Sequence, residues 1–154
     1  MRRWPWLVVA LTLAVDQATK LLIRASLDPA DSIPLIPSVL HLTYVQNTGA
    51  AFGLWRGYRG VFVLVSMIIA AWVFLELLQR SDRRWPIPLG LSLVLGGALG
   101  NLVDRVRVGY VIDFLDVRVW PVFNVADSAI SVGVGLLLLS QTVFWRRRSR
   151  IKSS

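Results

Sequence analysis

Two aspartates in the second half of the chain could form a catalytic pair. Asp113 lies in an apolar, strand-like stretch, and Asp127 lies in the first turn of a predicted helix. The segment between them is short enough to fold back and bring the two side chains together. Two facing carboxylates share a proton, because they cannot both carry a charge. One could then act as general base on a water molecule and the other as general acid toward a carbonyl oxygen and leaving nitrogen.

The composition leaves few other chemistries available. The chain has no cysteine and a single histidine, His41. This excludes a thiolate nucleophile and a cysteine-ligated metal. It also leaves little material for a zinc site, which needs several ligands, or for a serine–histidine triad. A carboxylate pair needs no cysteine, no histidine and no metal, so we expect no metal and no cofactor.

The elements that hold these residues are predicted to be membrane helices. Of the 154 residues, 55% are hydrophobic and 17% are charged, with a mean hydropathy of +0.60. Soluble domains carry about 25% charged residues. Four segments approach the roughly 20 apolar residues that span a bilayer, and they lie at about residues 4–25, 60–79, 85–104 and 124–145. The sequence therefore predicts an all-α membrane protein with four transmembrane helices, forming a single domain over residues 1–154.

The basic residues predict the orientation of these helices. The formal net charge is +8, and ten of the 17 lysines and arginines lie before the first helix, between the second and third, or after the fourth. These ten are Arg2, Arg3, Arg80, Arg83, Arg84, Arg146, Arg147, Arg148, Arg150 and Lys152. By the positive-inside rule, both termini are cytoplasmic. The basic tail is then a topology anchor beside anionic lipid, and we expect no nucleic-acid partner.

The two outward loops are predicted to contribute a small sheet. Residues 39–45 and 110–115 are rich in β-branched and aromatic side chains, as strands are. If these strands pair, they form a sheet on the outer membrane surface. Three prolines precede the first of these strands, at Pro29, Pro34 and Pro37, and they argue against a continuous helix at the start of the first loop.

Polar residues gather at the predicted outer interface, where each is a functional candidate. Besides the two aspartates, they are Asp16, Lys20, Asn47, Asn101, Arg105 and Asn124. Structural interpretations stay open for several of them. Asp127 could be the third-position partner of an N-cap Asn124, Asp16 and Lys20 could be an ion pair at i,i+4, and Arg105 could be an interfacial residue.

Two other functions stay open at this point. A small transporter or channel could use Asp16 and Lys20 as a relay, but it predicts polar residues across the whole bilayer depth. A serine–lysine protease would need Lys20 as its base, because Lys152 lies in the predicted cytoplasmic tail. No paired serine motif accompanies Lys20.

Five motifs, in order along the chain, resemble those of lipoprotein signal peptidase (signal peptidase II), the bacterial inner-membrane aspartic protease. Any one of them is weakly specific, but five in this order with four predicted helices are highly specific. The motifs are Asp16-Gln17-Ala18-Thr19-Lys20, residues 46–53 (QNTGAAFG), residues 100–105 (GNLVDR), Val111-Ile112-Asp113-Phe114, and residues 123–130 (FNVADSAI).

The resemblance implies a specific activity. The family removes signal peptides from prolipoproteins whose cysteine already bears a diacylglyceryl group, and it cuts just before that cysteine. Asp113 and Asp127 match the catalytic aspartates, and the six polar residues named above match supporting or substrate-binding positions. The family's outer β-cradle matches the two predicted strands, and its short interfacial helix falls near residues 53–60. The implied partners are diacylglyceryl-prolipoproteins and membrane lipids, and we expect a monomer in the bacterial inner membrane with its active site at the outer interface.

Overall fold

The computed structural model describes residues 3–49, 59–79 and 85–152, with side chains for all of these except Arg59 and residues 142–152. The interfacial helix expected near residues 53–60 lies largely outside the described residues. The helices are α1 (Trp4–Ser26), α2 (Arg59–Gln79), α3 (Pro86–Arg107) and α4 (Val125–Lys152), and the strands are β1 (Ser32–Ile36), β2 (Leu40–Asn47) and β3 (Val111–Asp116).

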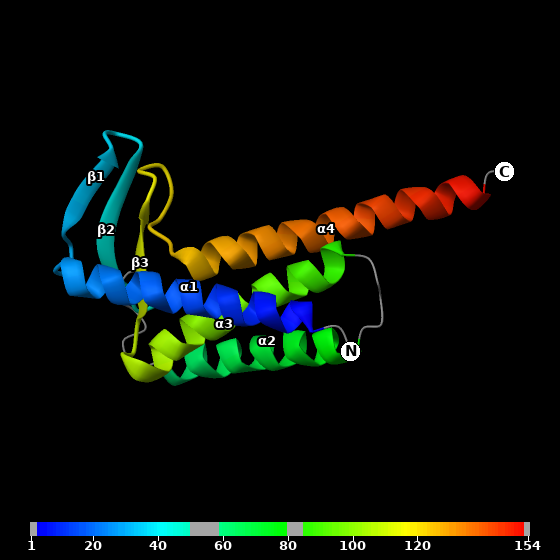
Figure 1. Cartoon of the computed structure of the whole chain (residues 1–154), viewed down its shortest axis with the longest axis horizontal. Coiled ribbons are helices and arrows are strands. Elements are labelled where there is room, and N and C mark those ends of the chain that lie inside the picture. The colour runs from blue at the N-terminus through cyan, green and yellow to red at the C-terminus, as the bar shows by residue number, and fades with distance from the viewer. Residues whose placement is uncertain (1–2, 50–58, 80–84, 153–154) are drawn as a thin grey trace.

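The four helices form a bundle with the sheet at one end (Figure 1). Three of them, α1, residues 60–79 of α2 and α3, are long and apolar enough to cross a membrane, and the apolar part of α4 covers the shorter stretch Val125–Gln141. α1 begins and α4 ends at the end of the bundle that is opposite the sheet. The polar residues of the predicted site lie at the sheet end of these helices or in the sheet itself.

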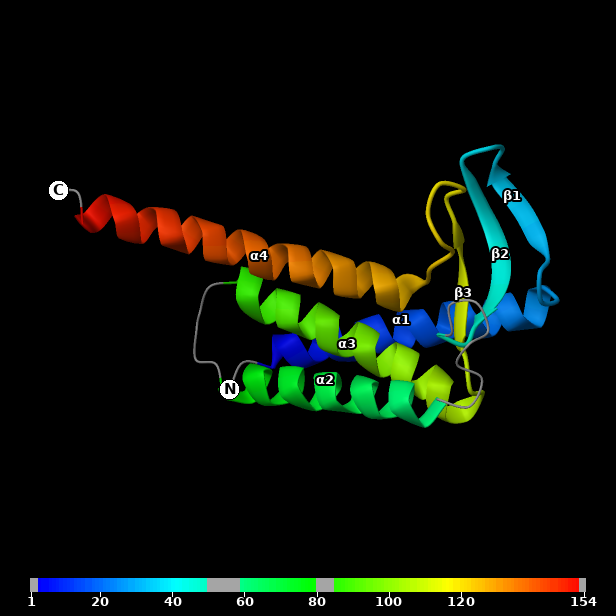
Figure 2. The same cartoon turned by 180° about the vertical axis from the view of Figure 1, so that it is seen from behind.

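α3 is the central helix of the bundle and contacts each of the other three. In Figure 2 it lies between α2 and α4. Its packing against α1 depends on Gly96 and Gly100, which have the i,i+4 spacing that lets helices approach closely. A Cβ at Gly96 would lie 2.7 Å from the Cβ of Thr12, and a Cβ at Gly100 would overlap the carboxylate of Asp16. The two glycines therefore allow α3 to reach the polar residues of α1.

The outer surface of the bundle is apolar. Most large side chains of α2 are exposed, with Trp72 at 63% and Ile68 at 59%. The buried core lies between α1, α2 and α3 and includes Val9, Val73 and Leu95. Exposed apolar side chains over whole helices are what a lipid solvent allows, because lipid tails are as apolar as leucine.

The sheet has the order β1-β2-β3, and both pairings are antiparallel. The two predicted strands, at residues 39–45 and 110–115, are confirmed as β2 and β3, and they pair with each other. The register sets Val45 opposite Asp113 and Asn47 opposite Val111. This register brings Asn47 to the same end of the sheet as Asp113.

The strand β1 was not predicted from the sequence. It contains Pro34, which cannot donate a backbone hydrogen bond. Because β1 is an edge strand and pairs only with β2, a proline is tolerated there. The sheet packs on the end of α1 through a second apolar core that includes Ile23, Tyr44 and Phe114. This contact fixes β3 relative to the helices.

Candidate active site

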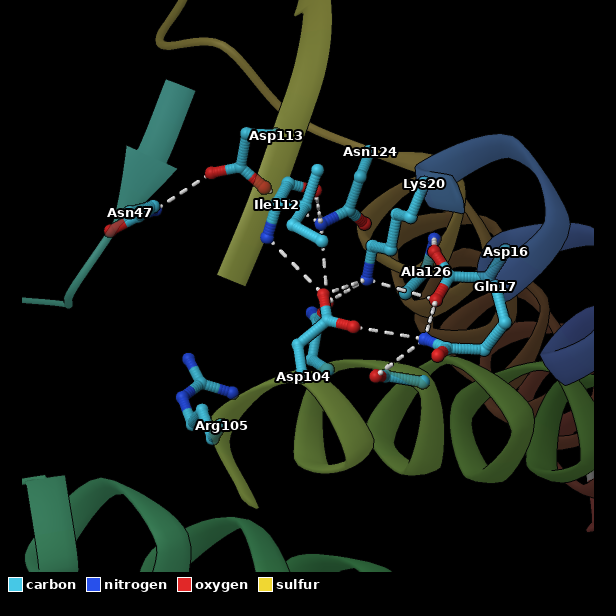
Figure 3. Close-up of polar contacts among 12 residues, drawn as sticks. Asp16, Gln17, Lys20, Asn47, Asp104, Arg105, Ile112, Asp113, Asn124 and Ala126 are labelled. Atoms are coloured by element: carbon cyan, nitrogen blue, oxygen red, sulfur yellow. Dashed lines mark hydrogen bonds and ion pairs between the residues drawn. The ribbon is translucent and has the colours of Figure 1, made fainter. Parts of the chain in front are cut away.

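Lys20 is the centre of a buried polar cluster at the sheet end of the bundle (Figure 3). Its side chain is 1% exposed, and its Nζ lies 2.9 Å from Asp16 Oδ2 and 2.8 Å from Asp104 Oδ2. The same Nζ donates a hydrogen bond of 3.0 Å to Asn101 Oδ1. The ion pair predicted between Asp16 and Lys20 is confirmed. All three protons of the ammonium group have an acceptor, as a buried cation requires.

The two carboxylates that pair with Lys20 also accept backbone hydrogen bonds from α4 and β3, the elements that contain the candidate catalytic aspartates. Asp16 Oδ1 accepts a hydrogen bond of 2.9 Å from the backbone N of Ala126, in the first turn of α4. Asp104 Oδ2 accepts one of 3.2 Å from the backbone N of Ile112, in β3. Since Asp127 and Asp113 are the next residues along the chain, Lys20 links the two elements through two carboxylates.

Gln17 joins the two acids a second time. Its Nε2 donates to Asp16 Oδ2 at 3.2 Å and to Asp104 Oδ1 at 3.0 Å. It also donates to the carbonyl oxygen of Gly100 at 3.2 Å. α1 and α3 are thus connected by polar contacts next to Gly100.

Two asparagines lie between the candidate catalytic aspartates. Asn124 donates from Nδ2 to Asp113 Oδ1 at 2.7 Å, and its backbone N donates to Asp127 Oδ2 at 3.3 Å. Asn101 donates from Nδ2 to Asp127 Oδ1 at 2.8 Å, and its Oδ1 also accepts from Asn124 Nδ2 at 3.1 Å. Asn124 therefore bridges Asp113 and Asp127, and Asn101 connects that bridge to Lys20.

Asp113 is nearly fully buried, at 1% exposed, and both of its oxygens accept hydrogen bonds. Asn47 supplies the second of these from Nδ2, at 2.8 Å to Oδ2. The pKa of Asp113 is raised to about 6, chiefly by burial and to a smaller extent by the negative charge of Asp127. Its hydrogen bonds to Asn47 and Asn124 and the charge of Lys20 act in the opposite direction. Within this pair, Asp113 is therefore the carboxyl group suited to hold a proton.

Asp127 has a different environment. It is only half-buried, and its backbone N donates to Asn124 Oδ1 at 2.9 Å. With the reciprocal bond from the backbone N of Asn124, this is a capping box at the start of α4. The structural interpretation of Asp127 as a cap partner is thus confirmed. It does not exclude chemistry, because the cap fixes the carboxylate beside Asp113 while leaving it open to water.

The structure brings together the residues predicted from the sequence, and it changes the role expected for Asn124. Asn124 is fully buried, and its side chain contacts protein groups on all sides. It therefore positions the two aspartates and has no free face with which to hold a substrate. Arg105 is half-buried; it donates to Ser66 Oγ of α2 at 3.4 Å, and Asp127, Asp113 and Asp104 are its charged neighbours.

Two residues of the cluster, Asp104 and Gln17, had no functional role in the sequence prediction. Asp104 is 3% exposed and contacts Lys20, Gln17 and Ile112. A signal existed, because an aspartate three residues after Asn101 in an apolar helix is costly unless it is paired. In the described part of the chain, no three His, Cys, Asp or Glu side chains converge as a metal site would require.

Comparison with known proteins connects this chain to one family. Residues 8–143 match the family profile described as "Signal peptidase (SPase) II". The lipoprotein signal peptidase of Moorella thermoacetica is 51% identical over 134 residues, covering 86% of this chain and 89% of that protein. That of Syntrophotalea carbinolica is 50% identical over 149 residues, covering 91% and 89%.

A solved structure supports the same relationship. A bacterial membrane enzyme determined by the in meso method at 1.9 Å resolution superposes with a TM-score of 0.83 at 32% identity, covering 89% of this chain and 91% of that chain. The profile match covers most of the chain, and the relatives align over nearly their full length. The chain therefore belongs to the signal peptidase II family, whose members are membrane proteases that process the signal peptides of lipoproteins.

Proposed function

We propose that this protein is an aspartic endopeptidase that removes signal peptides from diacylglyceryl-modified prolipoproteins by cutting just before the lipidated cysteine. The observation that carries the proposal is the bridged pair of carboxylates, in which Asn124 contacts both Asp113 and Asp127. One carboxyl is buried and has a raised pKa, and the other is open to water. These are the two environments that an acid and a base need.

The mechanism follows from these environments. Asp127, as the base, takes a proton from a water molecule while the water oxygen attacks the scissile carbonyl carbon. Asp113 donates its proton to the carbonyl oxygen, so that a neutral tetrahedral intermediate forms. The carbon–nitrogen bond then breaks, and the proton held by Asp127 goes to the leaving amino group of cysteine. A hydroxyl proton of the intermediate returns to Asp113 as the new carboxyl group forms.

We further propose a single membrane domain with the sheet end at the outer surface of the bacterial inner membrane. Transmembrane segments at about residues 4–25, 60–79, 85–104 and 124–145 would leave both termini in the cytoplasm. The excess of basic residues at the opposite end of the bundle supports this orientation. A monomer suffices, since one chain supplies both aspartates. The substrate's signal helix would enter from the lipid, with its acyl chains remaining in the outer leaflet.

The position of the buried charges favours a protease over a transporter. The buried charged side chains of the described bundle and of β3 are Asp16, Lys20, Asp104, Asp113 and Asp116. All of them lie at the sheet end of the bundle, and the first four belong to the polar cluster of the candidate site. A relay across the bilayer would need such groups along its whole depth. Lys20 is engaged by three acceptors, so it is not available as the base of a serine–lysine protease.

The experiment that tests this function is a cleavage assay with two matched substrates. Purified full-length protein in detergent is given the same prolipoprotein with and without its diacylglyceryl group, and the products are identified by mass spectrometry. We expect cleavage of the lipidated form only, with the lipidated cysteine as the new amino terminus. Equal cleavage of both forms, or a cut at another bond, would contradict the proposed substrate.

Arg105 is expected to contribute to substrate binding. Arg105→Ala should reduce kcat/KM by about ten- to a hundredfold, the scale of one hydrogen bond to a charged group, with most of the effect on KM. The protein should still insert and purify normally, because Arg105 lies outside the Lys20 cluster. Steady-state kinetics on the lipidated substrate measure this effect, and Arg105→Lys serves as the charge-retaining control. An unchanged kcat/KM for Arg105→Ala would remove Arg105 from the site.

The raised pKa of Asp113 predicts an activity that falls with increasing pH. The usual pKa is 3.8 and the value here is about 6, so Asp113 is protonated below about pH 6 and loses its proton above it. Because the acid must be protonated, kcat/KM should decline about tenfold per pH unit above that pKa. A kcat/KM profile measured across this range tests the expectation. A kcat/KM that rises with pH through 6 would contradict the proposal, because it would mean that Asp113 acts as the base and not as the acid.

A further inference from the structure

Two arginines at the sheet end of the bundle line a cavity that the proposed chemistry does not use. Arg24 lies in the last turn of α1, and Arg107 is the last residue of α3. Both line a cavity between these helices, together with the apolar side chains of Leu21 and Val108. Gln17, Lys20, Asp104 and Ile112 complete the lining, so the buried ion cluster forms the inner wall of this cavity.

The cavity lies on the opposite side of α3 from the substrate-binding residue proposed above. Arg105 donates to Ser66 of α2, whereas Arg107 is two residues later, about 200° around the helix, and faces α1. A group bound between Arg24 and Arg107 would therefore lie on the α1 side of α3, whereas Arg105 lies on its α2 side.

Neither guanidinium has a hydrogen bond or an ion pair among the residues that the structure describes, and both side chains are exposed. A basic residue at the C-terminal end of a helix interacts favourably with the helix dipole, by about 0.3–1 kcal/mol. That effect acts on each helix separately, and it does not explain why two arginines from different helices line the same cavity.

The surroundings of the cavity indicate lipid. Leu22 and Val106, in the same last turns of α1 and α3, are 66% and 57% exposed. Apolar side chains this exposed at the end of a spanning helix lie against the boundary between acyl chains and headgroups. The guanidinium groups would then lie at the level of the lipid phosphates. Leu21 and Val108 supply an apolar wall for the first part of an acyl chain.

The formal charges around the cavity also favour one anion. Asp16, Lys20 and Asp104 together carry a formal charge of −1, and Arg24 and Arg107 bring the group to +1. One phosphodiester would bring it to zero. Arginine is suited to this ligand, because its planar fork of N–H donors matches two phosphate oxygens at once.

We propose that Arg24 and Arg107 bind the phosphodiester headgroup of an anionic phospholipid at the sheet end of the bundle. The bound lipid would stabilise the junction of α1 and α3 against which Lys20 and Asp104 lie. This inference rests on the membrane placement proposed above but not on which residues are catalytic, so it can fail while the peptidase assignment holds, and the reverse.

The test is a lipid titration followed by thermal unfolding of the full-length protein in a non-ionic detergent. Phosphatidylglycerol should raise Tm in a saturable manner, and phosphatidylcholine should not. Arg24→Gln/Arg107→Gln should shift the midpoint of the phosphatidylglycerol titration by about tenfold or more, as loss of charge-assisted phosphate contacts predicts. Arg24→Lys/Arg107→Lys, which keeps the charge, should recover part of this shift.

Three outcomes would overturn the proposal. In the first, Arg146→Gln/Arg148→Gln, at the other end of the bundle, shifts the midpoint as much as the cavity variant, which would indicate a general charge effect. In the second, phosphatidylcholine stabilises as well as phosphatidylglycerol. In the third, inorganic phosphate alone gives the same saturable rise in Tm, which would mean a site for free anions. Cleavage of the lipidated substrate by the cavity variant, measured in detergent, separates this result from failure of the peptidase assignment.

Discussion

Asp113→Asn and Asp127→Asn are each expected to lower the rate of prolipoprotein cleavage by about a thousandfold or more, the scale of a lost general acid or base. Asparagine keeps the shape of each side chain and can still take part in hydrogen bonds. It cannot take a proton from water, as proposed for Asp127, nor supply one as a carboxylic acid does, as proposed for Asp113. The substitutions therefore remove the chemistry with little change in packing.

The double variant should be scarcely slower than either single variant. Residues that act as a unit in one reaction step are non-additive, since loss of one partner already disables the other. Single-turnover cleavage of the lipidated substrate measures this, and accumulation of uncleaved prolipoprotein in cells gives an independent readout. Normal cleavage by either single variant, inserted at normal levels, would rule out the pair.

β3 supplies a matched control for these substitutions. Asp116 is also buried and lies on the same strand, but its side chain contacts Thr43 and Arg118. It pairs with His41, at the opposite end of the β2–β3 pairing from Asn47. Asp116→Asn should leave cleavage close to the wild-type rate. A loss as large as that of Asp113→Asn would indicate that the strand tolerates no substitution, and the effect at Asp113 would then be structural.

Lys20→Met is expected to have the second large effect, on both stability and activity. The substitution leaves the carboxylates of Asp16 and Asp104 buried without their cation, and breaking a buried pair in this way costs about 3–5 kcal/mol. Asp16 holds the first turn of α4 and Asp104 holds β3, so the loss should also separate Asp127 from Asp113. We expect a lower Tm, a reduced yield of folded protein and little cleavage.

The same substitution at Lys152 is the control, since these are the two lysines of the chain and Lys152 lies at the end of α4 away from the sheet. Lys152→Met should leave Tm and cleavage unchanged. A second variant keeps the prediction testable if Lys20→Met does not fold. Gln17→Ala removes the other link between Asp16 and Asp104 without removing a charge, and it should lower Tm by a smaller amount. Full activity and stability in Lys20→Met would contradict the positioning role.

Much of this protein could be predicted from its sequence, because a membrane restricts the available structures. Long apolar runs with few charges are expected to be helices in lipid, because a helix satisfies its own backbone polar groups. The positions of α1, α2 and α3 therefore follow from composition. The strands β2 and β3 follow from their β-branched and aromatic residues. The absence of cysteine and the single His41 narrow the chemistry to carboxylates, and the ordered motifs point to the family.

Other features depend on contacts between residues distant in the sequence. β1 is a strand only because β2 is available to pair with it, which local propensity around Pro34 cannot show. Likewise, the sequence predicts Asn124 as a helix cap or a substrate-binding residue, and only the packing of β3 against α4 encloses it between the two aspartates.

The sequence by itself therefore determined the membrane helices, the two central strands and the identity of the candidate catalytic pair. The tertiary structure decided how that pair is held. Lys20 and Asp104 are 84 residues apart in number, and their ion pair forms because Gly96 and Gly100 let α3 approach α1. In a buried, low-dielectric position each charge needs its partner, so the packing of α1 on α3 and the geometry of Asp113 and Asp127 are established together.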